Sequence, residues 1–402
     1  MSGRPALFAA ARLSYGLRNI SFASPDAFWR AARRACLSEL LGAPRVRGFR
    51  GVREDEAAAL VDAIADEART TGSPVNLSEK LVAASNRIVR RVAFGDDSEA
   101  GVEVRAVLEE TQRLLGAFFV ADYVPWLGWL DVLRGLRRRL ERDLDAFYER
   151  VIDEHIDKRG EISKKEEDEE EDLVDVLLDL HGDPAHRNTF SSRDHIKGIL
   201  TDMLIAGTDT SAATVEWTMT ELVRHPDVLA KAQHEVRSLV GDKEMVHESD
   251  LPRLPRLHRL RLQPPAPLLV PRETTEPCSM LGHAIPAKTR VLVNAKAIGL
   301  DPVAWGPDAA AFVPERHEEV ADLGDHKPWH DGFALVPFGV GRRSCPGVHF
   351  ATAVVELMLA NLLFAFDWRV PPGGVLDVEE QSGLTVLRKN PLVLVAERRR
   401  LP

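Results

Sequence analysis

Apolar residues recur every three or four positions along most of the chain, which is the spacing of helices that bury one face. This spacing predicts helices over residues 26–42, 53–71, 77–94, 101–120, 133–158, 192–223, 226–240 and 347–366. The helix over 192–223 is the longest of them, and most of its first half is apolar. We therefore expect a largely helical protein with one long helix near the middle of the sequence.

The pattern changes after Pro264, where proline and β-branched residues become more frequent. Residues 290–296 are expected to form a short strand, and residues 385–387 and 392–396 a terminal hairpin. The acidic run over residues 160–172 is typical of a solvated loop. The expected fold class is mainly α with a small β portion, in one domain over residues 1–402.

Composition narrows the class of protein. The chain has 402 residues, 45% of them hydrophobic, and can bury a large core together with a cofactor. Its net charge of −10 argues against a nucleic-acid partner, which would need a basic face. We expect no signal peptide and no transmembrane segment, because a span needs roughly 20 consecutive apolar residues and the apolar run over 354–366 is interrupted by Glu356.

The three cysteines are Cys36, Cys278 and Cys345, too few and too far apart for a disulfide framework. Cys36 and Cys278 are expected to be small buried hydrophobic residues. Cys345 lies in a glycine-rich segment, but the segment lacks the third glycine of a dinucleotide loop and the lysine of a phosphate loop. A zinc site using Cys345 and His349 lacks its other two ligands.

The segment over residues 338–347 reads FGVGRRSCPG. It places Cys345 just before a helix, with Pro346 in the first turn, where the helix N-terminus favours a thiolate. Arg343 adds a positive charge two residues away. A thiolate so placed is suited to bind the iron of a haem.

Other residues of the segment suit the same task. Gly341 and Gly347 let the backbone approach a flat macrocycle, and Phe338 would shield the sulfur from water. The pattern FxxGxRxCxG resembles the haem-binding signature of the cytochrome P450 superfamily. The resemblance extends over nearly the whole chain and is greatest to plant microsomal (A-type) members. It implies a fold in which haem b lies between the long central helix and the helix after Cys345.

The long central helix contains the sequence AGTDTS over residues 206–211, which resembles the oxygen-activating motif of the family. The resemblance implies that Gly207 loosens the helix where dioxygen fits, that Thr210 offers it a hydroxyl, and that Asp209 delivers protons. The alternative is a cluster of hydroxyl side chains bonded to helix carbonyls.

Four residues are implied as contacts of the haem propionates. Trp29 and Arg33 share one helical face as the family's WxxxR motif, Arg272 matches a contact in the VPRE segment, and Arg343 is the fourth. The resemblance also implies an NADPH-cytochrome P450 reductase as electron donor. By the same resemblance, Arg30, Arg34 and Arg342 would lie on the face behind the cysteine that receives this reductase.

The family's substrate contacts fall on mostly apolar residues, which predicts a hydrophobic small molecule. The residues implied are Ile199, Met203, Ala206, Leu268, Leu269 and Leu384. The same residues would equally suit an ordinary core.

Two departures from the family pattern stand out. The family's membrane anchor, first helix and first strands are expected ahead of a start like this one, so we interpret the sequence as N-terminally truncated. His258 stands where the family has the glutamate that pairs with Arg261 and Arg316. Losing one partner of a buried ion pair costs about 3–5 kcal/mol.

Three readings follow. The first is a monooxygenase of a plant metabolite, at the cytosolic face of the endoplasmic reticulum. The second is a haem-thiolate isomerase or dehydratase that needs no dioxygen, against which Thr210 argues. The third is a non-functional product that cannot hold haem, which His258 favours.

Overall fold

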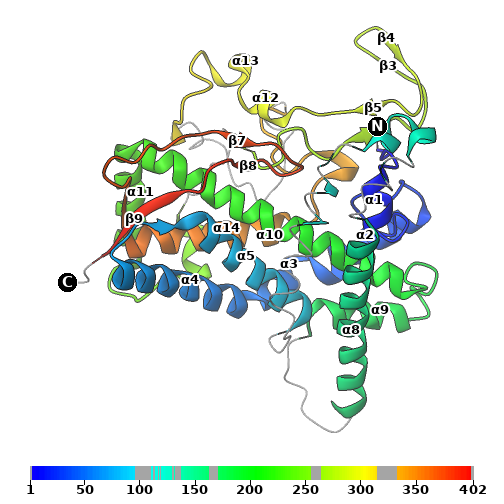
Figure 1. Ribbon diagram of the computed structural model, residues 1–402, viewed down its shortest axis with the longest axis horizontal. Helices are drawn as coiled ribbons and strands as arrows, with labels where there is room; N and C mark the ends of the chain where they lie inside the picture. The colour runs from blue at the N-terminus through cyan, green and yellow to red at the C-terminus, as the bar shows by residue number, and fades with distance from the viewer. Residues whose placement is uncertain are drawn as a thin grey trace. The chain divides into compact units, whose positions relative to one another are not determined.

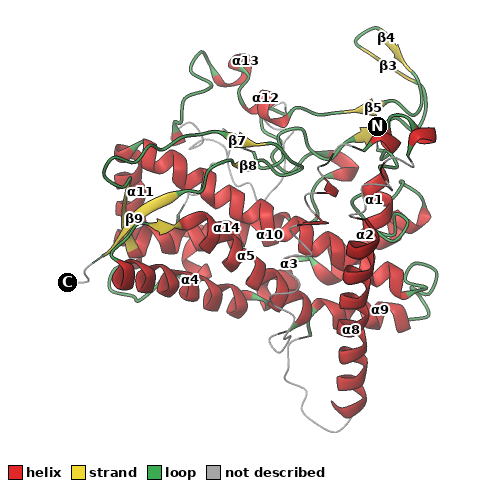
Figure 2. Cartoon of the chain, in the orientation of Figure 1, coloured by secondary structure: helices red, strands yellow, loops and turns green. Residues whose placement is uncertain are grey.

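The structure, a computed structural model, describes residues 2–95, 110–111, 114–115, 117, 119–128, 131, 137–162, 171–254, 264–314 and 333–399. These residues are mostly helical, with a few short strands (Figure 2). They form two compact units, each described here by itself. Unit 1 comprises Met1–Gly48, Val89–Gly207 and Val270–Val293, and unit 2 comprises Phe49–Ile88, Thr208–Leu269 and Asn294–Pro402. That the chain is one domain stays a prediction.

Unit 1 is built from helices around the first half of α10 (Arg193–Arg224). The other helical elements are α1 (Phe8–Leu13), α2 (Ala27–Ala35), a π-helical turn (Cys36–Leu40), α3 (Ala43–Gly48), the 3-10 turns Val120–Asp122 and Pro125–Leu127, α8 (Arg137–Ile162) and α9 (Leu173–Gly182). Two small antiparallel pairs complete the unit: β2 (Arg272–Glu273) with β5 (Arg290–Val291), and β3 (Cys278–Met280) with β4 (His283–Ile285).

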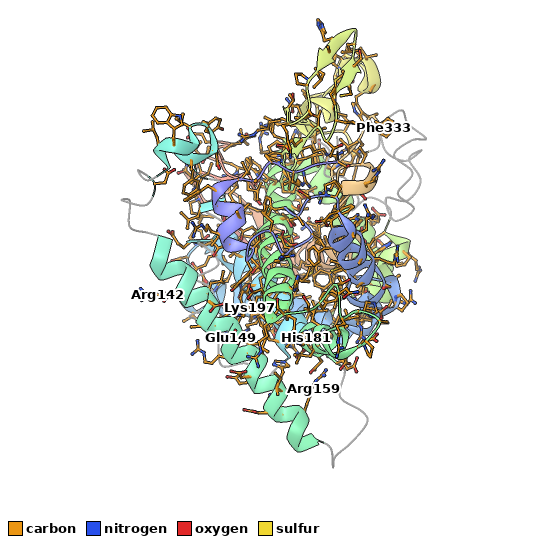
Figure 3. All side chains as sticks on the ribbon, turned by 90° about the vertical axis from the view of Figure 1, so that its right-hand side faces the viewer. Arg142, Glu149, Arg159, His181, Lys197 and Phe333 are labelled. Carbon is orange, nitrogen blue, oxygen red and sulfur yellow. The ribbon has the colours of Figure 1, made fainter. Side chains whose placement is uncertain are left out.

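Ion pairs join α8 to α10 in unit 1. The Lys197 side chain is only 3% exposed and contacts the carboxylates of Asp145 and Glu149. Lys197 and Glu149 lie side by side between the two helices (Figure 3). Arg193 contacts Glu149 as well, at 2.5 Å. These contacts fix where the first half of α10 lies within its unit.

Unit 2 packs helices against a three-stranded antiparallel sheet of order β1–β9–β6 (Figure 1). The strands are β1 (Val75–Asn76), β6 (Phe366–Arg369) and β9 (Val393–Arg398), and the long helices are α4 (Arg50–Thr71), α11 (Pro226–Val240) and α14 (Val348–Ala365). Helix α5 (Leu77–Phe94) begins in this unit and ends in unit 1. Smaller elements are β7 (Glu380–Gln381), β8 (Leu387–Arg388), α12 (Ala295–Gly299), α13 (Pro302–Trp305) and the 3-10 turns Glu248–Arg253 and Gly341–Arg343.

Helix α14 is the centre of the unit 2 core. Its buried residues occupy every side of the helix, and they include the polar Asn361, which is 1% exposed. The Asn361 amide accepts from the backbone N–H of Val246 at 3.0 Å and donates to the Val246 carbonyl at 3.0 Å. By length and hydropathy α14 could cross a membrane, but 67% of it is buried inside the protein, as expected for a core helix.

Most of the predicted helices are confirmed. The helices over 77–94 and 226–240 have the predicted bounds, and α10 and α14 agree within one residue. The helix over 26–42 widens into a π-helical turn after Ala35. Most of the predicted helix over 101–120 lies outside the described residues.

The predicted strands are partly wrong. The strand over 290–296 ends at Val291, because Asn294 caps helix α12 by accepting from the backbone N–H of Ala297 at 2.8 Å. The two segments of the predicted terminal hairpin do not pair with each other. Strand β8 pairs with β7, and β9 is the central strand between β1 and β6. Alternation of apolar and polar residues indicates a strand but does not identify its partner. The predicted pairing of residues 385–387 with 392–396 was therefore wrong.

Candidate active site

The segment around Cys345 in unit 2 folds back on itself. The backbone N–H of Cys345 donates to the carbonyl of Phe338 at 2.8 Å, and that of Ser344 donates to Gly341 at 2.9 Å. Gly341 has a φ of +70°, a conformation that residues with a side chain rarely adopt. The loop therefore brings the backbones of Phe338 and Cys345 together, and Gly341 is needed for its turn. That the Phe338 ring shields the sulfur stays a prediction.

Cys345 forms no disulfide and is half-buried. Arg343, two residues earlier, is only 7% exposed, whereas Arg342 is exposed. Helix α14 begins at Val348 with Gly347 as its N-cap, so Pro346 precedes the cap and the prediction that it lies in the first turn is wrong. Cys345 still lies within one turn of the helix N-terminus, whose dipole favours a thiolate.

Helix α10 is buried along most of its length but opens near its middle. Residues 195–202 and 211–217 are buried. Between them Ala206 is exposed, while Met203, Ile205, Gly207, Asp209 and Thr210 are partly exposed. We call these six residues the exposed window of α10. The side chains of the exposed window are therefore accessible, although the helix is buried on both sides of it. The family pattern expects oxygen and substrate at this position.

The predicted proton-handling residues, Asp209 and Thr210, both lie in the exposed window. Their neighbours Thr208 and Ser211 are buried, and neither hydroxyl has a hydrogen-bond partner within the described residues. The interpretation of this segment as hydroxyls bonded to helix carbonyls therefore fails for Thr208 and Ser211. The roles of Asp209 and Thr210 stay predictions.

Gly207 has a packing role that the sequence did not reveal. A Cβ at Gly207 would lie 2.9 Å from Cγ2 of Val89 on helix α5. The absence of a side chain thus lets α5 approach α10 closely in unit 1. The predicted loosening of the helix for dioxygen is not needed to explain this glycine.

Trp29 and Arg33 lie on one face of α2 in unit 1, as predicted. Asp26 caps the helix by accepting from the backbone N–H of Trp29 at 2.8 Å. The Arg33 guanidinium lies 5.8 Å from the Trp29 ring centroid. The indole N–H of Trp29, its single donor, donates to the carbonyl of Ile20 at 2.9 Å. A propionate contact by Trp29 would require that hydrogen bond to open.

A buried network in unit 1 organises the residues around Trp29. The carboxylate of Asp202 on α10 accepts from the Asn19 amide and from the backbone N–H groups of Ile20 and Ser21, at 2.8 to 3.0 Å. Burial raises the pKa of Asp202 to about 6, although these donors lower it. Asp202 therefore fixes the loop whose carbonyl receives Trp29.

Arg4 extends this network to Arg272. Its guanidinium donates to the carbonyl of Ser21 at 2.8 Å and to that of Pro271 at 2.8 Å. Arg272 follows in β2, and its partial burial lowers its pKa. A guanidinium taken from water in this way is stabilised by an anion beside it. The sequence offered no signal for Asp202 or Arg4, because their partners are distant along the chain.

The predicted substrate contacts differ in their exposure. Met203 and Ala206 lie in the exposed window, Leu268 is 45% exposed, and Leu269 and Leu384 are half-buried. Ile199 is fully buried and offers no surface to a substrate. The partners of the expected ion-pair cluster, His258, Arg261 and Arg316, lie outside the described residues.

The two remaining cysteines behave differently. Cys36 is fully buried, as predicted, whereas Cys278 is half-buried on β3, so that part of the prediction is wrong. The described residues contain one group of possible metal ligands: His155, Asp172 and Asp175. Nε2 of His155 is already bonded to Asp172 at 2.8 Å, and Asp175 is paired with Arg159. This arrangement is satisfied without an ion.

Comparison with known proteins identifies the family of the chain. The family model described as Cytochrome P450 matches residues 1–395. The chain is 48% identical to cytochrome P450 71A9 of Glycine max over 98% of its own length and 80% of that protein. It is 42% identical to strychnine-11-hydroxylase of Strychnos nux-vomica, over 98% and 78% of the two chains. A solved zebra fish cytochrome P450 structure with abiraterone matches with a TM-score of 0.80 at 23% identity, over 99% of this chain and 89% of that one.

A mainly helical fold with a cysteine loop ahead of its last long helix is that of the haem-thiolate oxidoreductases, and the chain belongs to the cytochrome P450 family. The fold class and the family predicted from the sequence are both confirmed. The protein is by family a monooxygenase that binds haem iron, and its relatives belong to plant secondary metabolism.

Proposed function

We propose that the protein inserts one atom of O2 into a hydrophobic small-molecule metabolite and reduces the other atom to water. The two electrons come from NADPH through a flavin reductase, and two protons complete the water. Haem b, when bound, would supply the oxygen-activating iron chemistry, and the Cys345 thiolate would hold its iron and promote that chemistry. The observation that carries the proposal is the position of Cys345 near the start of α14, where its backbone N–H donates to the Phe338 carbonyl.

The residues of the exposed window would serve the reaction as proton carriers. The Thr210 hydroxyl would hold a proton at its Oγ1, and the Asp209 carboxylate would pass protons inward from water. Both side chains are partly exposed on a helix that is otherwise buried on either side of them. Proton delivery must keep pace with electron delivery, so this pair would decide how much of the consumed oxygen ends in product.

Arginines are the residues that would hold the haem propionates. Arg343 is nearly buried next to the cysteine loop, and Arg272 is desolvated enough for its pKa to fall. Arg33 lies over the Trp29 ring on α2. A guanidinium can meet a carboxylate with two parallel hydrogen bonds, which fixes orientation as well as charge. Trp29 is proposed mainly to hold the loop through its hydrogen bond to the Ile20 carbonyl. It could contact a propionate only if this hydrogen bond opened.

The substrate is proposed to be apolar and small. Met203, Ala206, Leu268, Leu269 and Leu384 would line its site, and none of these side chains carries a polar group. Binding would then rest mostly on the burial of apolar surface, at about 25 cal/mol per Å².

The reductase is proposed to dock on α2. Arg30 and Arg34 are exposed and lie one helical turn apart. By family, we propose the cytosolic face of the endoplasmic reticulum as the place where the two proteins meet. The charge reversals R30E and R34E should slow reductase-driven turnover, and more so at low salt. Turnover that stays unchanged at low salt would exclude this docking surface.

The first experiment is the absorption spectrum of the reduced, carbon-monoxide-bound protein, expressed as the full chain with haem supplied. The parent protein should give the strongly red-shifted band of a thiolate-ligated haem. C345S should lose this band, and the matched control C278S should keep it. A parent protein without a haem band would overturn the proposal and favour a product disabled at the His258 position.

A further inference from the structure

The indole of Trp217 on α10 is bonded to a segment far away in the sequence. Its N–H donates to the carbonyl of Val386 at 3.1 Å, and the side chain is only 2% exposed. Both residues belong to unit 2. Val386 lies two residues after Leu384, one of the proposed substrate contacts.

The Val386 peptide group is held from its other side as well. Its N–H donates to the carbonyl of Pro265 at 2.8 Å. Pro265 begins the segment that carries Leu268 and Leu269, the other proposed contacts in this region. Leu269 has a φ of +52°, so this segment follows a tight path that needs support. A single peptide at Val386 thus joins two substrate-contact segments to Trp217.

Arg388, two residues after Val386, makes a second connection between this segment and α10. Its guanidinium donates to the Thr220 hydroxyl at 3.2 Å and to the Asp377 carbonyl at 2.7 Å. It also lies 5.6 Å from the Trp217 ring centroid, and the side chain is only 5% exposed. Trp217 and Thr220 are three positions apart on α10, so they share a face of the helix. Figure 1 shows strand β8, which contains Arg388, running beside α10.

The position of Trp217 along α10 relates it to the exposed window. Trp217 follows Thr210 by seven residues, about two helical turns, so the two side chains lie on the same face, roughly 10 Å apart along the axis. A helix that is hydrogen-bonded throughout this stretch transmits position with little change in length.

We propose that Trp217 is a positioning residue that sets the distance between Thr210 on α10 and the substrate-contact segments at Leu268, Leu269 and Leu384, all within unit 2. The inference rests on the proposed function for the role of those segments. Trp217 itself would touch neither substrate nor cofactor. It determines which atom of a bound molecule is presented to Thr210, and so contributes to specificity.

The test compares two ligands that bind haem iron but differ in bulk. Imidazole needs only the iron and little space, whereas 4-phenylimidazole must also fit its ring against the walls of the site. In the holoprotein, W217F should raise the dissociation constant of 4-phenylimidazole at least about fivefold, the loss expected for one hydrogen bond. The constant for imidazole should stay within about twofold of the parent value.

The matched control is W368F. The Trp368 indole N–H also donates to a backbone carbonyl, that of Leu362 at 2.9 Å, and the side chain is 6% exposed. W368F should leave the ratio of the two dissociation constants unchanged. T220V, which removes the hydroxyl that Arg388 contacts, should shift the ratio in the same direction as W217F but less.

A readout that does not depend on haem completes the test. In W217F, hydrogen exchange over residues 384–388 should be at least about fivefold faster than in the parent or in W368F. An unchanged ratio and unchanged exchange in W217F would overturn the proposal, and so would an equal loss of both ligands, which indicates general damage. If the parent binds no haem, but exchange over residues 384–388 is still faster in W217F than in the parent, the proposed function fails. The positioning role of Trp217 then stands.

Discussion

The carboxylate of Asp202, on the long helix α10, accepts a hydrogen bond of 2.8 Å from the backbone N–H of Ile20, 182 residues earlier in the chain. Its second oxygen accepts from the Asn19 amide at 2.8 Å, and Asn19 in turn accepts from the backbone N–H of Phe22 at 3.1 Å. Because the Ile20 carbonyl receives the Trp29 indole, this carboxylate fixes the loop next to the proposed propionate arm.

The variant D202N should destabilise the protein by about 1–3 kcal/mol at pH 7.5, the cost of a buried hydrogen-bonding group without a partner. An amide can replace one carboxylate oxygen, but its NH2 group would face the NH2 group of Asn19. Asn19 cannot turn round without losing its bond from Phe22. The measurement is chemical unfolding, with D194N, at an exposed position near the start of the same helix, as the control.

The loss of stability caused by D202N should also depend on pH. Burial raises the pKa of Asp202 to about 6, above its usual 3.8. A carboxyl whose pKa is raised by folding contributes stability that is present below the unfolded value and is lost as pH rises through the folded value. The difference in unfolding free energy between parent and D202N should therefore be larger at pH 5 than at pH 7.5. A difference that grows with pH would contradict this.

A second pH effect is expected between α8 and α9. Burial alone would lower the pKa of His155, but the hydrogen bond and charge of Asp172 outweigh it, so the pKa is raised above 6.5. The stability from this pair is fully present below 6.5 and is lost as pH rises through the raised value. The protection factors of the α9 amides, which correct for the intrinsic rise of exchange with pH, should therefore fall in the parent as pH rises above 6.5.

In H155Q that pH dependence should disappear, because glutamine does not titrate in this range. H186Q serves as the matched control, since His186 and Asp183 form a similar pair at 2.8 Å in a more exposed position. If H186Q removed the pH dependence and H155Q did not, the buried pair would not be the cause.

The Arg53–Glu248 pair should be the most costly ion pair to break among those described here. Arg53 is fully buried, and its guanidinium donates to both oxygens of Glu248, at 2.7 and 2.8 Å. E248Q leaves a buried guanidinium without its anion, which costs about 3–5 kcal/mol. The exposed pair of Arg69 and Asp66 offers the comparison: D66N should leave the unfolding midpoint unchanged. Equal effects of the two variants would refute the argument from burial.

Local features were the ones that could be predicted from the sequence. The helix over 77–94 follows from its periodicity, and the Cys345 loop follows from ten consecutive residues, because the interactions that define each lie within it. The contact of Trp217 with Val386 spans 169 residues, and that of Asn19 with Asp202 spans 183. Nothing in a single sequence signals such pairs, so the residues that support the site were missed. The residues predicted to carry its chemistry lie in short sequence motifs and could be named.

The same limit applies to Gly207, which the sequence motif assigned to oxygen and the structure places against Val89. G207A would bring a methyl group to 2.9 Å from Cγ2 of Val89. Overpacking of this kind costs about 1–3 kcal/mol, of which alanine's better helix propensity recovers up to about 1 kcal/mol. We expect G207A to unfold at lower denaturant concentration than the parent, by a net amount of about 1–2 kcal/mol.

The double variant V89A/G207A separates the two roles of this glycine. If the clash is the cause, the double variant should be more stable than the sum of the single changes predicts, by about 1 kcal/mol. A G207A protein as stable as the parent would show that α5 yields without cost and that packing does not require the glycine. A double variant that regains stability, yet consumes NADPH without forming product, would show that the missing side chain also makes room for oxygen beside Thr210.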